Sequence, residues 1–333
     1  DGKPFFIKGA GLEFGHLKSL AEAGGNAFRT WRVANGERDA TDILDEAEAL
    51  GLKVCMGLDI ARERHGFDYS DQAAVIAQNE AMMRDVIRLK DHPALLMWGL
   101  GNELNLRAKN DGVWDAMEDL AIRIKQVDPD HPVTTMLAGI DEPTVTAITQ
   151  RAPSLDFLSF QIYGEIDQLP EILEKAGYDG PYQITEWGPT GHWESPATDW
   201  DRPFEPSSTQ KANDIARRYD EIILTDSKRC LGAYIFLWGQ KQERTPTWYG
   251  MFLETGERTA AVDVMQKAWT GDWPTHQAPQ IQSLRLNAEV APKSIEGAVN
   301  QVFHAEVHAT ESDDHLISWR VREEVPTALQ SDG

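Results

Sequence analysis

The sequence predicts an α/β fold, a (β/α)8 TIM barrel followed by a small C-terminal β-sandwich of the immunoglobulin-like kind. Short apolar strand patterns alternate with amphipathic helix patterns eight times between residues 5 and 271. The strand patterns are almost continuously apolar, as expected of parallel strands that are buried on both faces. Strict alternation of this kind over about 250 residues is typical of the barrel in length and in order.

The predicted elements follow one another without any repeat beyond this strand–helix period. Each helix pattern places apolar residues three and four positions apart. Several helices end on glycine, as in AGG, ALG and KAG, which suits the left-handed residue that closes a helix. The strands are expected at 5–12, 27–33, 53–60, 94–105, 132–138, 155–164, 181–188 and 231–239, and the helices at 17–25, 41–51, 73–92, 113–128, 144–153, 169–177, 208–226 and 259–271.

The pattern changes after residue 271. The stretch from Asp272 to Pro279 has the composition of a linker. Residues 280–287 and 302–309 alternate like strands with one exposed face, and 316–324 are interpreted as a further strand. We therefore expect a barrel over residues 1–272 and a small β-rich, immunoglobulin-like domain over 273–333. That domain is compact or truncated, because a complete one has about 100 residues.

Composition and charge exclude several classes of function. The chain has 333 residues, and a hydrophobic content of 41% is enough for a packed core, which excludes disorder. Its net charge of −22 would repel nucleic acid. The longest apolar runs are far shorter than the roughly 18 residues of a transmembrane helix. Two cysteines cannot form a disulfide framework, and no ligand spacing or phosphate-binding motif indicates a metal or a cofactor.

Two glutamates stand at the ends of two predicted strands, where a barrel of this type places its chemistry. Glu103 follows Gly101 and Asn102 at the end of the fourth strand, and Glu186 lies at the end of the seventh. Carboxyl groups at these positions face each other across the barrel mouth. Cleavage of a glycosidic bond needs such a pair, because one group protonates the leaving oxygen while the other attacks the anomeric carbon or activates water.

Side chains at other strand ends suit the same chemistry. Arg29, on the second strand, is expected to hold one carboxylate ionised. Asn102 is expected to bond a sugar 2-hydroxyl, and Tyr163 to donate to the nucleophile. Trp238 offers a flat face to a pyranose ring, with packing in the core as its alternative. The further candidates for substrate binding lie on or beside the barrel-mouth loops, at Asp59, Trp187, His192, Trp193, Gln240, Glu243 and Trp248.

The chain has eleven tryptophans, a surplus that indicates either a surface for flat ligands or heavy use in the core. Trp31 and Trp98 lie on predicted strands and are assigned to the core. Trp193 and Trp200 fit a sugar subsite and loop packing equally well. The aromatic residues beside Glu186 gather after the seventh and eighth strands, which favours a cleft with several sugar subsites and therefore a polysaccharide.

These motifs resemble known families. GNE at 101–103 and TEWG at 185–188, with Arg29, Tyr163 and Trp238, resemble the clan of retaining β-glycosidases with (β/α)8 barrels. GKPFFIKGAG (2–11) and GGNAFRTW (24–31) resemble the barrel domain of family 2 glycosidases. The spacing of the two glutamates, the segment FLWGQKQERTPTWYGMF (236–252) and the β-rich tail most resemble glycoside hydrolase family 158, a family of endo-β-1,3-glucanases.

The resemblance implies a retaining mechanism in which Glu186 is the nucleophile and Glu103 the acid/base, with their carboxyl groups about 5–5.5 Å apart. It implies endo-acting cleavage of β-1,3-glucan such as laminarin. Another β-linked polysaccharide or galactoside, such as β-mannan or β-1,4-glucan, and a catalytically silent carbohydrate-binding barrel stay open as alternatives. Where family 2 has Asn-x-Tyr on the sixth strand this chain has Gln161-Ile162-Tyr163, so no sugar contact is carried over to Gln161.

The expected partner is a polysaccharide substrate. We expect no nucleic acid, no transmembrane segment, no cofactor and no metal, and we expect a monomer. An enzyme that degrades a polysaccharide acts outside the cytoplasm, so a secreted, periplasmic or cell-surface location is the expectation.

Overall fold

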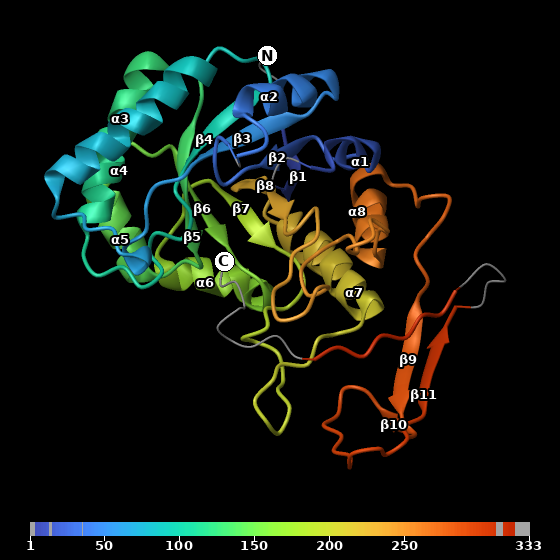
Figure 1. The fold of residues 1–333 in the computed structure, drawn as a ribbon. Coiled ribbons are helices and arrows are strands. Elements are labelled where there is room, and N and C mark those ends of the chain that lie inside the picture. The colour runs from blue at the N-terminus through green and yellow to red at the C-terminus, as the bar shows by residue number, and fades with distance from the viewer. Residues whose placement is uncertain (1–3, 13–14, 35, 311–315, 324–333) are drawn as a thin grey trace. The chain divides into compact units, whose positions relative to one another are not determined.

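The computed structural model describes residues 4–12, 15–34, 36–310 and 316–323. Within these residues eight parallel strands form a closed barrel, in which each strand pairs with the next along the chain and the last pairs with the first (Figure 1). The predicted barrel is confirmed. Its strands are β1 (Ile7–Gly11), β2 (Ala27–Arg29), β3 (Lys53–Leu58), β4 (Leu95–Leu100), β5 (Val133–Ala138), β6 (Phe157–Gln161), β7 (Tyr182–Trp187) and β8 (Cys230–Ile235).

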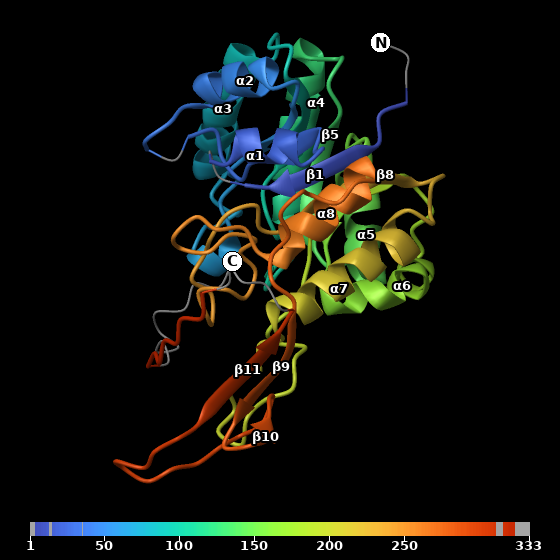
Figure 2. The ribbon, with the colours of Figure 1, turned by 90° about the vertical axis from the view of Figure 1, so that its right-hand side faces the viewer.

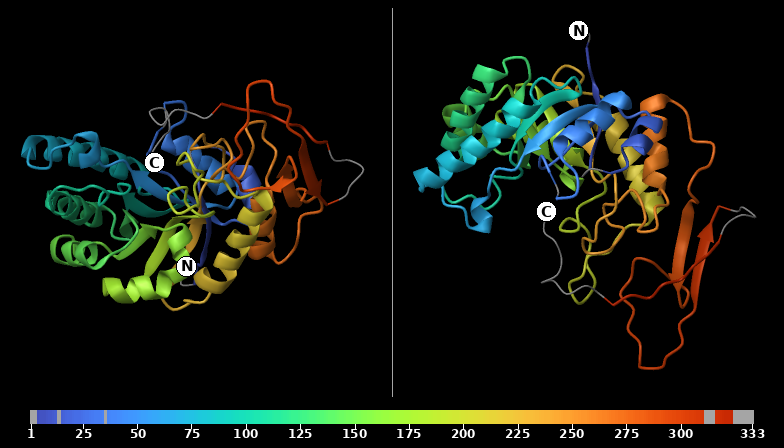
Figure 3. Two further views of the ribbon diagram at one scale, coloured as in Figure 1. Left: turned by 90° about the horizontal axis from the view of Figure 1, so that it is seen from below. Right: turned by 45° about the horizontal axis from the view of Figure 1, so that its top comes forward.

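Helices alternate with these strands along the chain. Figure 3 shows those coloured cyan to green on the outer side of the strands. The α-helices are α1 (Leu17–Glu22), α2 (Ala40–Ala49), α3 (Gln72–Leu89), α4 (Gly112–Val127), α5 (Glu142–Arg151), α6 (Leu169–Ala176), α7 (Ser208–Arg218) and α8 (Ala260–Thr270), and short turns of helix occur at η1 (Glu63–His65), η2 (Gly164–Gln168) and η3 (Tyr219–Ile223).

Local sequence sets the helix boundaries. The side chain of Asp71 accepts hydrogen bonds from the first backbone N–H groups of α3, and Asp141 does the same for α5. Ser207 and Gln210 form a reciprocal capping box at the start of α7. Gly177, in the KAG motif, adopts φ of 67° and ends α6.

The barrel interior is packed with side chains and is not a pore. Gly9 of β1 leaves room for the ring of Tyr234, because a Cβ at Gly9 would lie 2.4 Å from Tyr234 Cδ1. This packing forms the floor beneath the carboxyl ends of the strands. The cluster that fills the interior consists of Ile7, Ala27, Cys55, Met97, Met136, Phe157 and Tyr234.

The chain divides into two compact units, which we call the first unit (residues 1–187 and 221–236) and the second unit (residues 188–220 and 237–333). The first unit carries all of the barrel strands. The second unit carries α7 and α8, together with a three-stranded antiparallel sheet in the order β10–β9–β11. Its strands are β9 (Ile281–Leu286), β10 (Glu289–Val290) and β11 (Ala305–Ala309), and Figure 2 shows β9 and β11 side by side.

This small sheet is weak support for the predicted β-sandwich. Two of the predicted strands, at 280–287 and 302–309, correspond to β9 and β11. The third was expected at 316–324, and residues 316–323 have no assigned strand; residue 324 lies outside the described residues. The predicted boundary between residues 272 and 273 stays a prediction.

The structure was also searched for transmembrane segments. Within the described ranges, none of the helices combines the length and the apolar character that crossing a bilayer requires.

Candidate active site

Glu103 and Glu186 lie at the carboxyl ends of β4 and β7. Glu186 belongs to β7 itself, whereas Glu103 follows β4 in a tight turn. Gly101 and Glu103 both have a left-handed backbone, with φ of 69° and 53°. A Cβ at Gly101 would lie 2.6 Å from Leu104 Cδ1, so the turn that carries Glu103 requires a glycine at its start.

The backbone conformation of Glu103 is unfavourable by itself. A left-handed conformation costs a residue with a side chain about 1–2 kcal/mol. Two hydrogen bonds offset the cost: the Glu103 N–H donates to the Met136 carbonyl at 2.7 Å, and Arg64 donates to the Glu103 carbonyl. Strain of this kind persists where the surroundings fix it, and it often marks a functional position.

The carboxylate of Glu186 accepts hydrogen bonds from three side chains. Arg29 Nη1 lies 3.3 Å and Trp31 Nε1 3.0 Å from Glu186 Oε1. The Tyr163 hydroxyl donates to Oε2 at 2.8 Å. Arg29 is completely buried, so its charge is poorly screened. Together these donors orient the Glu186 carboxylate and stabilise its negative charge, as a nucleophile requires.

Asn102 is oriented by two further donors. Its Oδ1 accepts from Arg29 Nη2 at 2.7 Å and from Gln161 Nε2 at 2.6 Å. Because both bonds use the amide oxygen, the amide NH2 group is the part of Asn102 that remains to donate to a ligand. Gln161 therefore acts on Asn102, although the sequence assigned it no role.

Glu103 has a different environment from Glu186. Burial, and then the negative charge of Glu186, raise the pKa of the Glu103 carboxyl to about 7, against the opposing charges of Arg64 and Arg29. Arg64 Nη2 lies 3.1 Å from Glu103 Oε2. A carboxyl group with this pKa carries a proton for much of the time near neutral pH, which suits a general acid.

The structure adds Trp31 and Arg64 to the site. Trp31 was assigned to the core, yet its ring N–H bonds Glu186. Its position two residues after Arg29 was the available signal, because side chains two apart on a strand share a face. Arg64 lies in η1, a single turn of helix in the β3–α3 loop, and no pattern in the sequence places it against Glu103.

Two other candidates, Trp187 and Asp59, lie in the first unit. The Trp187 side chain has no exposed surface, which favours packing in place of the predicted sugar contact. Asp59 forms an ion pair with Arg62, with 3.6 Å between Asp59 Oδ1 and Arg62 Nη1. Arg62 Nε in turn donates to the Asn102 carbonyl at 2.9 Å, so Arg62 links Asp59 to the site.

The remaining candidates belong to the second unit, where several gather around His192. The His192 ring meets the rings of Trp193 and Trp248 edge to face, and its Nε2 lies 3.7 Å from Glu243 Oε1. Burial acts to raise the pKa of Glu243, but the bond to His192 and the charge of Lys241 outweigh it and lower that pKa. Trp193 is 61% exposed, whereas Trp248 is buried.

Trp238 and Gln240 serve the structure of the second unit. The Trp238 ring is 1% exposed, stacks on Trp269 at 5.6 Å and meets Phe252 edge to face. This burial fits the alternative of core packing and does not fit an open face for a sugar ring. Gln240 Nε2 donates to the Pro246 carbonyl at 3.0 Å and holds its own loop.

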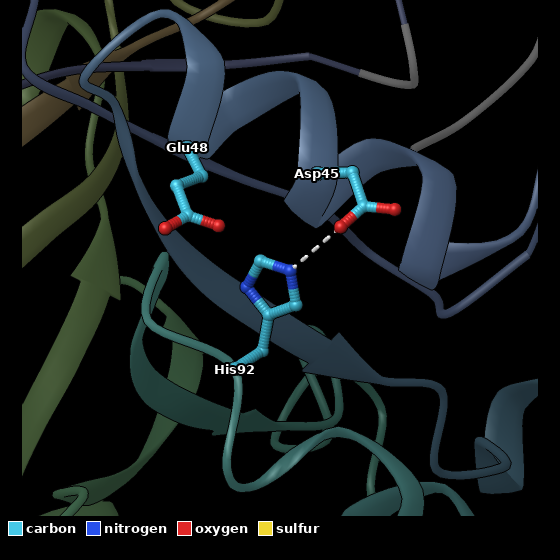
Figure 4. Close-up of side chains that lie close together, drawn as sticks. All are labelled: Asp45, Glu48 and His92. Atoms are coloured by element: carbon cyan, nitrogen blue, oxygen red, sulfur yellow. Dashed lines mark hydrogen bonds and ion pairs between the residues drawn. The ribbon is translucent and has the colours of Figure 1, made fainter.

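One cluster among the described residues has metal-ligand types within reach of one another. Figure 4 shows Asp45 and Glu48 on α2 beside His92, which precedes β4. The His92 Nδ1 accepts the Ala94 N–H, so the neutral ring carries its proton on Nε2, which lies 3.1 Å from Asp45 Oδ1. In this state neither ring nitrogen has a lone pair available for a cation. We therefore interpret the cluster as a structural contact between α2 and the segment before β4.

Known proteins contain barrels that are similar to this one. The TIM barrel domain of family 2 glycosyl hydrolases matches residues 37–194. The β-glucuronidase of Chlorocebus aethiops is 28% identical over 152 residues, which cover 40% of this chain and 22% of that protein. The human β-glucuronidase is 27% identical over 149 residues, with the same coverage. These matches support a (β/α)8 barrel of the retaining β-glycosidase type.

Solved structures show the same fold. A β-glucuronidase from Dictyoglomus thermophilum has a TM-score of 0.60 at 19% identity and covers 82% of this chain and 51% of its own. A β-galacturonidase from Eisenbergiella tayi, solved with galacturonate, has a TM-score of 0.58 at 16% identity over 80% of this chain and 51% of its own. The chain thus spans about half the length of these proteins and about a fifth of the curated relatives.

The comparisons correct one expectation. They support the resemblance of this barrel to family 2 and not the assignment to family 158. The family 158 assignment rested on the spacing of the two glutamates, on the segment 236–252 and on the tail, whereas the family 2 match covers residues 37–194, which include Glu103 and Glu186. Specificity for β-1,3-glucan has no support from them.

Proposed function

We propose that the chain hydrolyses a β-glycosidic bond with retention of configuration. The observation that carries the proposal is the contrast between two carboxyl groups. Glu186 is held by three donors, which suits attack on the anomeric carbon. Glu103 has a pKa raised to about 7 by burial and by the Glu186 charge, which suits protonation of the leaving oxygen.

The reaction follows from these two environments. Glu186 attacks the anomeric carbon while Glu103 gives its proton to the glycosidic oxygen, so the leaving alcohol departs and a glycosyl ester forms. The ester removes the negative charge that raised the pKa of Glu103, so that pKa falls and Glu103 can take a proton from water. The water oxygen then attacks the same carbon and releases Glu186. In this proposal the Asn102 amide donates to the sugar 2-hydroxyl throughout.

We infer an acidic sugar, a uronide, as the substrate class to test first. The inference comes from the names of similar proteins, β-glucuronidase and β-galacturonidase. Endo-acting cleavage of β-1,3-glucan is the second candidate, and it rests only on the resemblance to family 158 in the glutamate spacing, in residues 236–252 and in the tail.

The experiment is a substrate panel. Aryl β-D-glucuronides, galacturonides, galactosides, glucosides and mannosides are assayed beside laminarin, β-mannan and β-1,4-glucan, with sizing of the products. We expect turnover of a uronide. Short oligosaccharides from laminarin without turnover of any uronide would favour the second candidate. Binding of a glycan without turnover would indicate the silent barrel.

Three variants test the assignment of roles. Glu103→Gln and Glu186→Gln are each expected to lower kcat about a thousandfold or more, because each removes a group that changes its bonding during the reaction. The matched control is Glu171→Gln, an exposed residue on α6, which keeps full activity. Wild-type activity in either site variant would exclude the mechanism.

A further inference from the structure

Three arginines lie close together beside Glu103. Arg62 and Arg64 flank Glu63 in and next to η1, and Arg107 lies on the β4–α4 loop. Burial and then the charges of Arg62 and Arg107 lower the pKa of the Arg64 guanidinium, against the attraction of Glu103. The Arg64 guanidinium is therefore near enough to Arg62 and to Arg107 to be repelled by both, in a chain whose net charge is −22.

The two segments that carry these arginines are fastened together. The buried Glu63 carboxylate accepts the Lys109 N–H at 2.6 Å and the Asn110 side-chain amide at 2.9 Å. Both of these hydrogen bonds go to the loop of residues 105–110. They hold that loop, which carries Arg107, against η1, which carries Arg64.

Not every arginine has a counter-charge. Arg62 pairs with Asp59, and Arg64 pairs with Glu103. Arg107 is exposed and has no hydrogen bond or ion pair with any residue that the structure describes. Its φ of 56° is left-handed, a conformation that an arginine holds only at a cost. Arg64 also loses its counter-charge whenever Glu103 is protonated, which is the state that begins catalysis.

The contacts also locate the cluster along the substrate. Arg29, Trp31 and Tyr163 touch Glu186 and so surround the sugar that is transferred. Arg64 touches Glu103 and not Glu186. Because Glu103 delivers its proton to the oxygen of the leaving group, the arginines around Glu103 lie beside the leaving group.

We propose that Arg64 and Arg107, with Arg62 behind them, form a subsite for an acidic group, a carboxylate or a sulfate, on the leaving-group side of the cleaved bond. The proposal rests on the proposed function for its direction. Arginine suits such a group because its planar donors match two oxygens at once. An acidic group here binds the arginine that otherwise pairs with Glu103, and so favours the protonated acid that the first step needs.

The test compares two leaving groups of nearly the same shape. Aryl glycosides of 3-hydroxybenzoate and 3-hydroxybenzamide are made on the sugar that the substrate panel identifies. The wild type is expected to prefer the carboxylate in kcat/KM by about five- to tenfold at low ionic strength, and the preference is expected to shrink as salt is added. Arg107→Gln removes most of that preference, and Arg107→Glu reverses it.

The matched control is Arg84→Gln, which removes the same charge from an exposed position on α3 and keeps the preference. Calorimetry of free 3-hydroxybenzoate and 3-hydroxybenzamide with the whole protein is a readout that needs no turnover, and only the carboxylate should bind more weakly to Arg107→Gln. Equal preference in the wild type and in Arg107→Gln, in either measurement, overturns the subsite. If Glu103→Gln and Glu186→Gln lose turnover but the wild type shows no preference for the carboxylate, the subsite is excluded and the proposed function is retained.

Discussion

The ring N–H of Trp31 donates to Glu186 Oε1 at 3.0 Å, on the same oxygen that Arg29 approaches at 3.3 Å. The Arg29 guanidinium carbon also lies 4.7 Å from the centre of the Trp31 ring. Trp31 thus stabilises the site in two ways, because it bonds the carboxylate directly and packs against the cation that balances its charge.

Trp31→Phe is therefore expected to lower kcat. The ring stays and the donor is lost, and a hydrogen bond to a charged group contributes about 1.5–3 kcal/mol, which corresponds to roughly ten- to a hundredfold in rate. Steady-state kinetics at the pH optimum measures the loss. Trp114→Phe, in the buried face of α4, is the control and is expected to change stability but not kcat. Equal kcat values in Trp31→Phe and the wild type would remove Trp31 from the catalytic network.

The pH dependence should report the acid. Glu103 acts first in its protonated form, and its pKa is raised to about 7, so kcat/KM is expected to fall as the pH rises through about 7. The charge of Arg64 acts to lower that pKa, so Arg64→Met moves the fall to higher pH, whereas Arg64→Lys keeps it nearer the wild-type position. A fall that moved to lower pH in Arg64→Met would contradict the sign of this interaction.

Gly101 begins the turn that carries Glu103. Two alanine variants, at Gly139 and at Gly101, separate the cost of a left-handed backbone from the cost of a side-chain collision. Gly139→Ala places a side chain at φ of 63° with nothing within 4 Å, so it costs only the backbone strain of about 1 kcal/mol. Gly101→Ala adds a collision with Leu104, so its free energy of unfolding falls further and its activity is lost. Urea unfolding of both variants makes the comparison, and equal stability losses would show that Leu104 moves aside without cost.

The cluster around His192 yields a prediction for long substrates. The exposed ring of Trp193 suits stacking on a sugar ring. Trp193→Ala is expected to raise KM for a polysaccharide severalfold and to leave an aryl monoglycoside unaffected. Trp273→Ala, another exposed tryptophan of the second unit, is the control. If Trp193→Ala left the KM for the polysaccharide at its wild-type value, that ring would be assigned to loop packing.

The barrel could be predicted because its signal is local and repeated. Each strand in the first unit is apolar because both of its faces are covered, and Gly177 ends α6 as the KAG motif indicated. Rules about strand ends pointed to Glu103, Glu186, Arg29 and Tyr163, and in the structure Arg29 and Tyr163 both bond Glu186. The interpretation of residues 316–324 as a strand failed over 316–323, where alternation alone does not supply a pairing partner.

The rest of the site depends on contacts that no local pattern encodes. Trp31 and Trp238 are both tryptophans at strand ends, and their environments decide their roles: Trp31 meets Glu186, whereas Trp238 stacks on Trp269. Arg64 reaches Glu103 from a loop only because η1 turns it there. Substrate specificity was the weakest prediction for the same reason, since it was taken from loop sequence and from resemblance.

Trapping of the covalent intermediate shows which carboxylate is the nucleophile. The protein is incubated with a 2-deoxy-2-fluoro aryl glycoside of the sugar that it cleaves, and the labelled peptide is identified by mass spectrometry. If Glu186 is the nucleophile, we expect one added glycosyl group on Glu186. No label is expected to accumulate in Glu186→Gln. A label on Glu103, or no label on an enzyme that turns over the parent glycoside, would contradict that assignment.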